Sequence, residues 1–180
     1  VKVCALEHNI PVFQPETLKD GAILPILEEY NPDIIIVVAY GKILPEYILD
    51  YPKYGCVNIH GSLLPKYRGA APINWAIING DKETGVTTFF LKHEIDTGDV
   101  IYRDVVAIDD CDDAGTLHDK LMLQGGETVL RTVEAIVNGS VTAIAQDDMT
   151  VDELRPAPKI FRDTCHIDWL GCVDGIYNFV

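Results

Sequence analysis

The chain has 180 residues, 48% of them hydrophobic, which is enough apolar material for one globular domain with a buried core. Its formal net charge of −14 at pH 7 disfavours a broad surface for phosphate backbones, so we expect no DNA partner. No apolar run approaches the roughly 20 residues of a membrane span, and no basic and then apolar signal pattern opens the chain, so we expect a cytoplasmic protein without a membrane partner.

Hydrophobic periodicity predicts strands that alternate with helices, which is typical of an α/β fold built on an open sheet. The first strand is apolar on both faces and is therefore expected at the centre of the sheet. The predicted strands are 33–39, 56–59, 86–91 and 100–107, with a weaker one at 142–145. The predicted helices are 21–30, 72–79 and 114–138, the last with a buried stripe formed by Leu117, Leu121, Leu130 and Val133.

The part of the chain after the last predicted strand differs in character from the rest. Residues 147–162 include Pro156 and Pro158 among charged side chains and show no sustained period, which indicates a tether. We therefore divide the chain into a core, 1–146, and a linker, 147–180, that would lead to a further domain. The sequence starts without methionine and stops inside an apolar-periodic stretch, and we interpret it as a fragment.

The strand at 56–59 and its extension place two polar side chains together. Asn58 and His60 are two residues apart, so they share one face of the strand, roughly 7 Å apart. They lie at its carboxyl end, where open α/β sheets bind ligands. The Gly-containing turn at 94–99 could deliver Asp96 or Asp99 to the same place. Spacing alone also fits a hydrogen-bonded structural pair, which is the usual role of such residues.

Five short motifs follow one another in the order found in folate-dependent formyltransferases, which this chain resembles. They are Asn-Ile-His at 58–60, Ser-Leu-Leu-Pro at 62–65, Arg-Gly-Ala-Ala-Pro-Ile at 68–73, Glu-Thr-Gly-Val at 83–86 and Asp-Thr-Gly-Asp at 96–99. Segments 10–15 and 38–45 also resemble the family, so the resemblance covers nearly the whole chain. Within the family, Ala-Pro-Lys-Ile at 157–160 and Ile-Asp-Trp at 167–169 resemble the branch that acts on methionyl-tRNA.

The resemblance implies a fold and a reaction. The fold would be an open, mostly parallel, Rossmann-like sheet with helices on both faces, here lacking the family's first strands, so that strand edges would be exposed. The reaction would be transfer of a formyl group from 10-formyltetrahydrofolate to the free amino group of initiator methionyl-tRNA, by a protein that is a monomer at full length. A basic C-terminal domain, as in the family, would reconcile tRNA binding with the charge of this chain.

The matching positions imply a role for each site residue. Asn58 and a protonated His60 would donate hydrogen bonds to the oxyanion of an acyl-transfer step. Asp96 would keep His60 charged and oriented and would help to take a proton from the attacking amine. No metal is expected, because these three residues lack a third nitrogen or sulfur ligand nearby. The residues implied to contact the folate are Ser62, Leu63, Leu64, Pro65, Ile43 and Leu44.

Other polar and aromatic residues have more than one interpretation. Lys66 and Arg68 either attract an anionic group or are solvated loop residues, whereas Tyr67 and Trp75 favour packing. The other histidines lack partnered motifs, and the five cysteines lack metal-ligand spacing and are predicted to be reduced.

Three alternative functions remain open. The acceptor could be an amino sugar or another small amine. Water could replace the amine, which would make the protein a 10-formyltetrahydrofolate hydrolase. A truncated core could instead only bind the folate or a partner.

Overall fold

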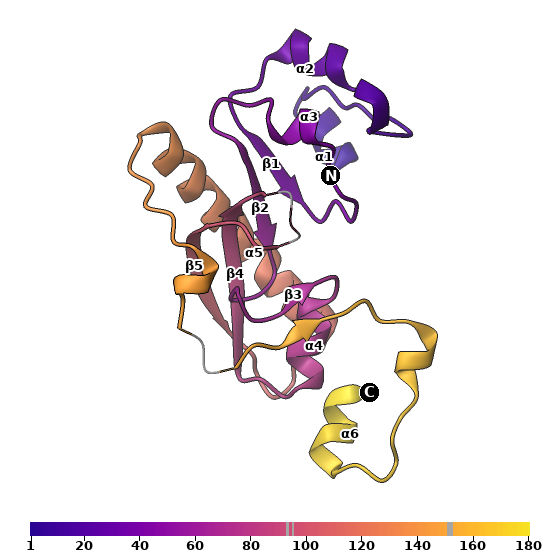
Figure 1. Ribbon diagram of the computed structural model, residues 1–180. Helices are drawn as coiled ribbons and strands as arrows, with labels where there is room; N and C mark the ends of the chain where they lie inside the picture. Colours follow the sequence, from indigo (N-terminus) through magenta and orange to yellow (C-terminus); the bar gives the residue numbers. More distant parts are fainter. Residues whose placement is uncertain (93, 95, 151–152) are drawn as a thin grey trace.

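The computed structural model describes residues 1–92, 94, 96–150 and 153–180, and its centre is an open, mixed four-stranded sheet (Figure 1). The strand order is β1-β2-β4-β5, from Ile35–Val38, Cys56–His60, Glu83–Phe90 and Val100–Ala107. β1 runs parallel to β2, whereas β4 is antiparallel to both of its neighbours. The expectation of a mostly parallel sheet is thus corrected to a mixed one. Only residues 91–99 join β4 to β5, which is shorter than the dozen or so residues of a parallel crossover, so these two strands pair as antiparallel neighbours.

The four main strands lie where the hydrophobic pattern predicts them, but two details differ. The strand expected at the centre, β1, lies at the edge of the described sheet, where Val38 is 61% exposed. The weak strand at 142–145 is reduced to a single bridge between Ile144 and Val100. Apolar character on both faces thus identified a strand but did not place it in the sheet.

The three predicted helices are confirmed as α2, Leu24–Tyr30, α4, Pro72–Ile78, and α5, Ala114–Val137. The structure adds α1, Lys2–Glu7, α3, Glu46–Leu49, and α6, Val173–Phe179, with α1 to α3 at one end of the molecule and α6 at the other (Figure 1). Short 3-10 turns occupy Lys19–Gly21, Gln146–Asp148 and Arg162–Cys165.

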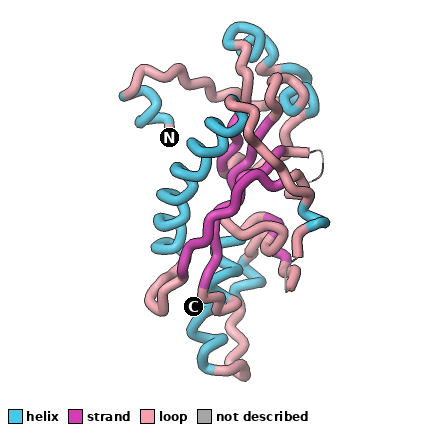
Figure 2. The backbone as a smooth tube through the Cα atoms, turned by 90° about the vertical axis from the view of Figure 1, so that its left-hand side faces the viewer, coloured by secondary structure: helices cyan, strands magenta, loops and turns pink. Residues whose placement is uncertain are grey.

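The long helix α5 lies along one face of the sheet (Figure 2). It begins after Asp113, whose carboxylate accepts hydrogen bonds from two backbone N–H groups of the first turn and so caps the helix. Leu117 and Leu121 are buried as predicted, but Leu130 is 68% exposed and the prediction was wrong there. The buried face instead continues through small polar residues, and the Thr132 and Thr88 hydroxyls share a 2.8 Å hydrogen bond between helix and strand.

On the opposite face of β4, a loop and not a helix covers the sheet. The Thr87 hydroxyl donates to the Ser62 carbonyl at 2.6 Å and accepts from the Leu64 N–H at 3.0 Å. These bonds fasten the loop that follows β2, and its Leu64 side chain is fully buried in a cluster with Phe89 of β4. The loop is therefore a fixed part of the core rather than a mobile connection.

Part of the predicted tether packs on the core. Pro156–Ala157 forms a two-residue strand, β6, parallel to β3, Arg68–Gly69. Ala157 is fully buried, and the Tyr67 N–H donates to the Arg155 carbonyl at 2.6 Å. The domain division after residue 146 stays a prediction. Over the residues that the structure describes, no helix is long and apolar enough to cross a membrane.

Candidate active site

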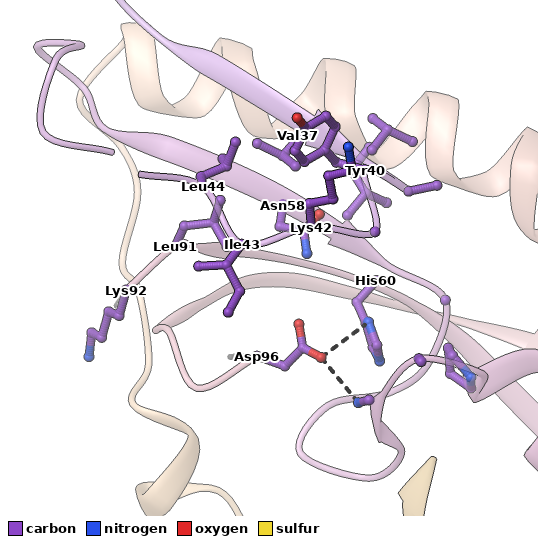
Figure 3. A pocket seen from close by; sticks show the side chains of 18 of the residues that line it. Val37, Tyr40, Lys42, Ile43, Leu44, Asn58, His60, Leu91, Lys92 and Asp96 are labelled. Atoms are coloured by element: carbon purple, nitrogen blue, oxygen red, sulfur yellow. Dashed lines mark hydrogen bonds and ion pairs between the residues drawn. The ribbon is translucent and has the colours of Figure 1, made fainter. Parts of the chain in front are cut away.

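A cavity of about 970 Å³ opens where β1 and β2 end (Figure 3). Its walls come from the turn after β1, from the end of β2, from the residues around β3, and from the segment that follows β4. Asn58, His60 and Asp96 all line it. The structure thus brings together the three residues predicted to be catalytic, although Asp96 lies 36 positions beyond His60 in the chain.

His60 is held by one ring nitrogen and presents the other to the cavity. It is 7% exposed, and its Nε2 lies 2.7 Å from the Tyr67 carbonyl oxygen. A carbonyl only accepts hydrogen bonds, so Nε2 must carry a proton and donate it. Nδ1 is therefore the variable nitrogen, a donor when the ring is charged and an acceptor when it is neutral. It lies 4.0 Å from Asp96 Oδ2.

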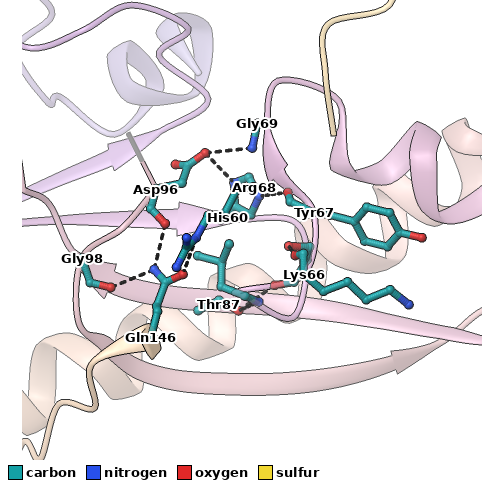
Figure 4. A network of polar contacts seen from close by, with 11 residues as sticks. His60, Lys66, Tyr67, Arg68, Gly69, Thr87, Asp96, Gly98 and Gln146 are labelled. Carbon is teal, nitrogen blue, oxygen red and sulfur yellow. Dashed lines mark hydrogen bonds and ion pairs between the residues drawn. The ribbon is translucent and has the colours of Figure 1, made fainter. Parts of the chain in front are cut away.

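Asp96 is 8% exposed, and a backbone N–H contacts its carboxylate (Figure 4). The Gly69 N–H donates to Oδ2 at 3.1 Å. Asp96 itself adopts a positive φ of 54°, in the left-handed region that residues with a side chain rarely occupy. Asp99, the other predicted candidate, is paired with Lys92 at 2.7 Å and does not line the cavity. Geometry therefore selects Asp96.

Asn58 is the least constrained of the three side chains. Its backbone is fixed between Val37 of β1 and Phe89 of β4, and its side chain is half-buried in the cavity wall. Its carboxamide has no hydrogen-bond partner in the described part of the chain. It is thus available to donate to a bound molecule.

An apolar wall faces these polar groups. Ile43 and Leu44 line the cavity together with Val37 and Leu91, and Ile43 is 75% exposed (Figure 3). This agrees with their predicted place at the site. Such a surface suits a flat ring system whose polar edge reaches Asn58 or backbone groups.

The other predicted folate contacts do not line this cavity. Ser62 and Leu64 are fully buried, and Ser62 Oγ donates to the Lys66 carbonyl at 2.7 Å. Pro65 is buried as well, and Leu63 lines a separate cavity of about 360 Å³. In the structure these four residues shape the loop that delivers the Tyr67 carbonyl to His60, and their contact with a folate remains a prediction.

The basic and aromatic residues of this loop are occupied within the protein. Lys66 pairs with Asp81 at 2.7 Å, whereas Arg68 Nε donates to the neutral carboxamide of Gln146 at 2.8 Å. Both side chains are thus held within the protein, but only the charge of Lys66 is paired with a carboxylate in the described residues. Tyr67 is 1% exposed and its hydroxyl also donates to Asp81, and Trp75 Nε1 donates to the Pro158 carbonyl. The expectation of packing roles for both aromatic residues is confirmed.

The remaining histidines that the structure describes, and the cysteines, do not line the cavity. His8, His118 and His166 are exposed, and His93 is outside the described residues. All five cysteines are free thiols, and burial raises the pKa of Cys56 to about 11. In the described ranges no group of three or more His, Cys, Asp or Glu side chains could hold a metal ion.

Three groups that the site uses were missed from the sequence: the Tyr67 carbonyl, the Gly69 N–H and the Gln146 carboxamide. The first two are backbone groups, which carry no side-chain signal. Gln146 lies 50 positions from Asp96, and no spacing rule connects them. For the Gly69 N–H, the only signal in the sequence is the glycine itself, which is the residue that readily adopts the positive φ found there.

Fold and site together define an α/β protein with an Asn, His and Asp group at the end of a sheet strand. A family model described as formyl transferase matches residues 1–133, and the chain belongs to this family. Among its members, the methionyl-tRNA formyltransferase of Bacteroides thetaiotaomicron is 58% identical over 181 aligned positions, covering 100% of this chain and 56% of that protein. The chain spans about half the length of the curated relatives that it matches.

Solved structures share the fold. HypX from Aquifex aeolicus, in complex with tetrahydrofolic acid, matches with a TM-score of 0.71 and 23% identity over 87% of this chain and 27% of that chain. The formyltransferase PseJ from Anoxybacillus kamchatkensis matches with a TM-score of 0.68 and 24% identity over 88% of this chain and 81% of that chain. Its complex holds tetrahydrofolate and a formamido sugar nucleotide.

Proposed function

We propose that this chain is the catalytic part of an enzyme that transfers a formyl group from 10-formyltetrahydrofolate to the amino group of initiator methionyl-tRNA. The observation that carries the proposal is the placement of the Asn58 carboxamide, His60 Nδ1 and Asp96 on the wall of one cavity. The acceptor is inferred from the relatives named methionyl-tRNA formyltransferase, of which several are 48–58% identical over the whole chain. The tetrahydrofolate in the HypX and PseJ complexes supports the donor.

The three side chains meet the demands of formyl transfer. The amine nitrogen forms a bond to the formyl carbon, the carbonyl oxygen becomes an oxyanion, and the bond to N10 of the folate then breaks as N10 gains a proton. The Asn58 N–H and a protonated His60 Nδ1 are aimed donors for the oxyanion. Asp96 stabilises the imidazolium by its charge and accepts the proton that the attacking ammonium loses, directly or through water.

The size of the cavity indicates which parts of the two substrates can bind inside it. About 970 Å³ is at the upper end of the range for small-molecule sites, roughly 300–1,000 Å³, so the cavity fits the folate ring system and a reacting group. A tRNA is far larger, and only its aminoacyl end would enter. Since this chain carries a net charge of −14, recognition of the phosphate backbone would rest on surfaces elsewhere in the enzyme.

The test is formyl transfer from 10-formyltetrahydrofolate to methionyl-tRNA by the full-length protein, compared with His60→Ala and Asp96→Asn. Losing the His60 donor is expected to lower kcat on the order of 10²–10³-fold. Asp99→Asn is the matched control, because Asp99 lies in the same segment but outside the cavity lining, and it is expected to keep activity. Equal loss in the Asp99 variant would contradict the assignment of Asp96.

Two related reactions would use the same residues and are outcomes of the same test. Transfer to a nucleotide-linked amino sugar, but not to methionyl-tRNA, would move the function toward that of PseJ, whose complex contains a formamido sugar. Formate release without any acceptor would indicate a hydrolase.

We further propose a cytoplasmic enzyme that is monomeric at full length and needs no metal. Light scattering of the full-length protein and activity after chelator treatment test the last two statements.

A further inference from the structure

Gln146 is the residue through which a distant part of the chain reaches the catalytic carboxylate. It is 3% exposed and lies in the turn Gln146–Asp148, well beyond α5. Its Nε2 donates to the carbonyl oxygens of Asp96 and Gly98, both at 2.8 Å (Figure 4). Its Oε1 accepts from Arg68 Nε, also at 2.8 Å. Every polar atom of this side chain is therefore used.

A carboxamide suits this position because it has one acceptor and two donors on a single plane. Arg68 can only donate, so it fixes the amide with the oxygen toward itself and the nitrogen toward the two carbonyls. Carbonyls two residues apart that share one nitrogen keep the turn around Asp96 closed. This turn contains the unusual positive φ of Asp96, which needs support from its surroundings to persist.

The same segment of chain also supports Asp96 from its other side. The Gly69 N–H donates to Asp96 Oδ2, and Gly69 belongs to β3, which pairs with Pro156–Ala157 of β6. Residues 146 and 156–157 thus fix both the turn that carries Asp96 and the backbone donor that aims it. Arg68, next to Gly69, joins the two supports.

We propose that Gln146 is a positioning residue, which sets the Asp96 carboxylate against the Gly69 N–H and at 4.0 Å from His60 Nδ1. The inference rests on the proposed function in one respect, since it takes Asp96 and His60 as the reacting pair. Residues 146 and 155–157 are then part of the active site, although none of these four lines the cavity.

The first test reads the position of Asp96 without any assay of activity. In the full-length protein labelled with 15N-glycine, the Gly69 amide proton reports its hydrogen bond to the carboxylate. We expect Gln146→Met and Gln146→Glu to move this resonance toward its position in Asp96→Ala and to speed its exchange with solvent. Gln146→Glu keeps the acceptor for Arg68 but loses the donors to the Asp96 and Gly98 carbonyls. It therefore separates the loss of these two bonds from the loss of the contact with Arg68. Gln14→Met, at an exposed glutamine, is the control.

The second test is a kinetic double-mutant cycle in the same protein. A displaced Asp96 is expected to lower kcat by about 10- to 100-fold with little change in KM for the folate, because the apolar part of the wall, which includes Ile43 and Leu44, is unchanged. Gln146→Met should cost little more when Asp96→Ala is already present, whereas a purely structural role would add its full loss. An unmoved Gly69 resonance in both Gln146 variants, or fully additive losses, would overturn the inference. If the unmutated protein transferred no formyl group, the proposed function would fail, and the Gly69 resonance would still decide the role of Gln146.

Discussion

Gly69→Ala tests how strictly the site depends on the close approach of two strands. Gly69 has a φ of 129°, a conformation essentially closed to residues with a Cβ, and a Cβ placed there would clash with the Ala157 carbonyl oxygen. Forcing this conformation costs about 1–3 kcal/mol, and separating β3 from β6 loses hydrogen bonds worth about 0.5–1.5 kcal/mol each. We therefore expect the free energy of unfolding to fall by roughly 2–4 kcal/mol.

The measurement is urea unfolding of the wild-type and variant proteins, together with kcat for formyl transfer. Gly126→Ala is the matched control, because it makes the same chemical change inside α5 where a Cβ meets no atom within 4 Å. It should raise stability by about 0.5–1 kcal/mol, since alanine is favoured over glycine in a helix. Wild-type stability and kcat in Gly69→Ala would refute the argument that β3 and β6 need this approach to hold Asp96.

Two further predictions follow from side chains outside the cavity. Burial alone would raise the pKa of Asp104, but hydrogen bonds led by that from Arg131 outweigh it and hold the pKa below the ordinary 3.8. A carboxylate with a lowered pKa adds stability at pH values above its pKa in the unfolded state, and this stability is lost as the pH falls through its pKa in the folded state. Asp104→Asn should therefore make the free energy of unfolding depend less steeply on pH below about pH 4. Urea unfolding from about pH 3 to 6 measures this dependence. Tyr67→Phe removes the hydroxyl that donates to Asp81 at 2.8 Å, and it should lower the free energy of unfolding by about 1–3 kcal/mol; an unchanged urea midpoint would show that the hydroxyl is dispensable.

The sequence identified the four strands of the main sheet and the helices α2, α4 and α5 because their signals are local. Strand and helix periods depend on neighbours along the chain, and the β2 pattern alone placed Asn58 and His60 on one face. Asp96 was a weaker case: its turn suggested a carboxylate at the site, and only the resemblance preferred it to Asp99. The structure supplies the physical reason, since Asp99 is paired with Lys92 and Asp96 is turned into the cavity.

Features that depend on distant parts of the chain were not predictable in this way. An apolar strand such as β1 can lie at the centre or at the edge, and the order β1-β2-β4-β5 is decided by pairing and not by composition. Leu130 is thirteen residues after Leu117, which at 3.6 residues per turn places it on roughly the opposite side of α5. The buried face continues past it through Thr132 and Ile136, so an apolar side chain in a helix need not belong to the buried stripe.

The segment after residue 146 also has contacts with distant parts of the chain that its sequence pattern does not predict, and some of them support the site. The prolines and charged residues after 146 predict an irregular segment, but they do not predict which groups its backbone contacts. In the structure the Arg155 carbonyl accepts from the Tyr67 N–H, and Ala157 pairs beside Gly69. The Tyr67 carbonyl accepts from His60 and the Gly69 N–H donates to Asp96, so a chain ended at 146 would lose the outer support of both proposed catalytic residues. The smallest unit that contains the whole site therefore extends at least to Ala157, whatever role the residues after it have.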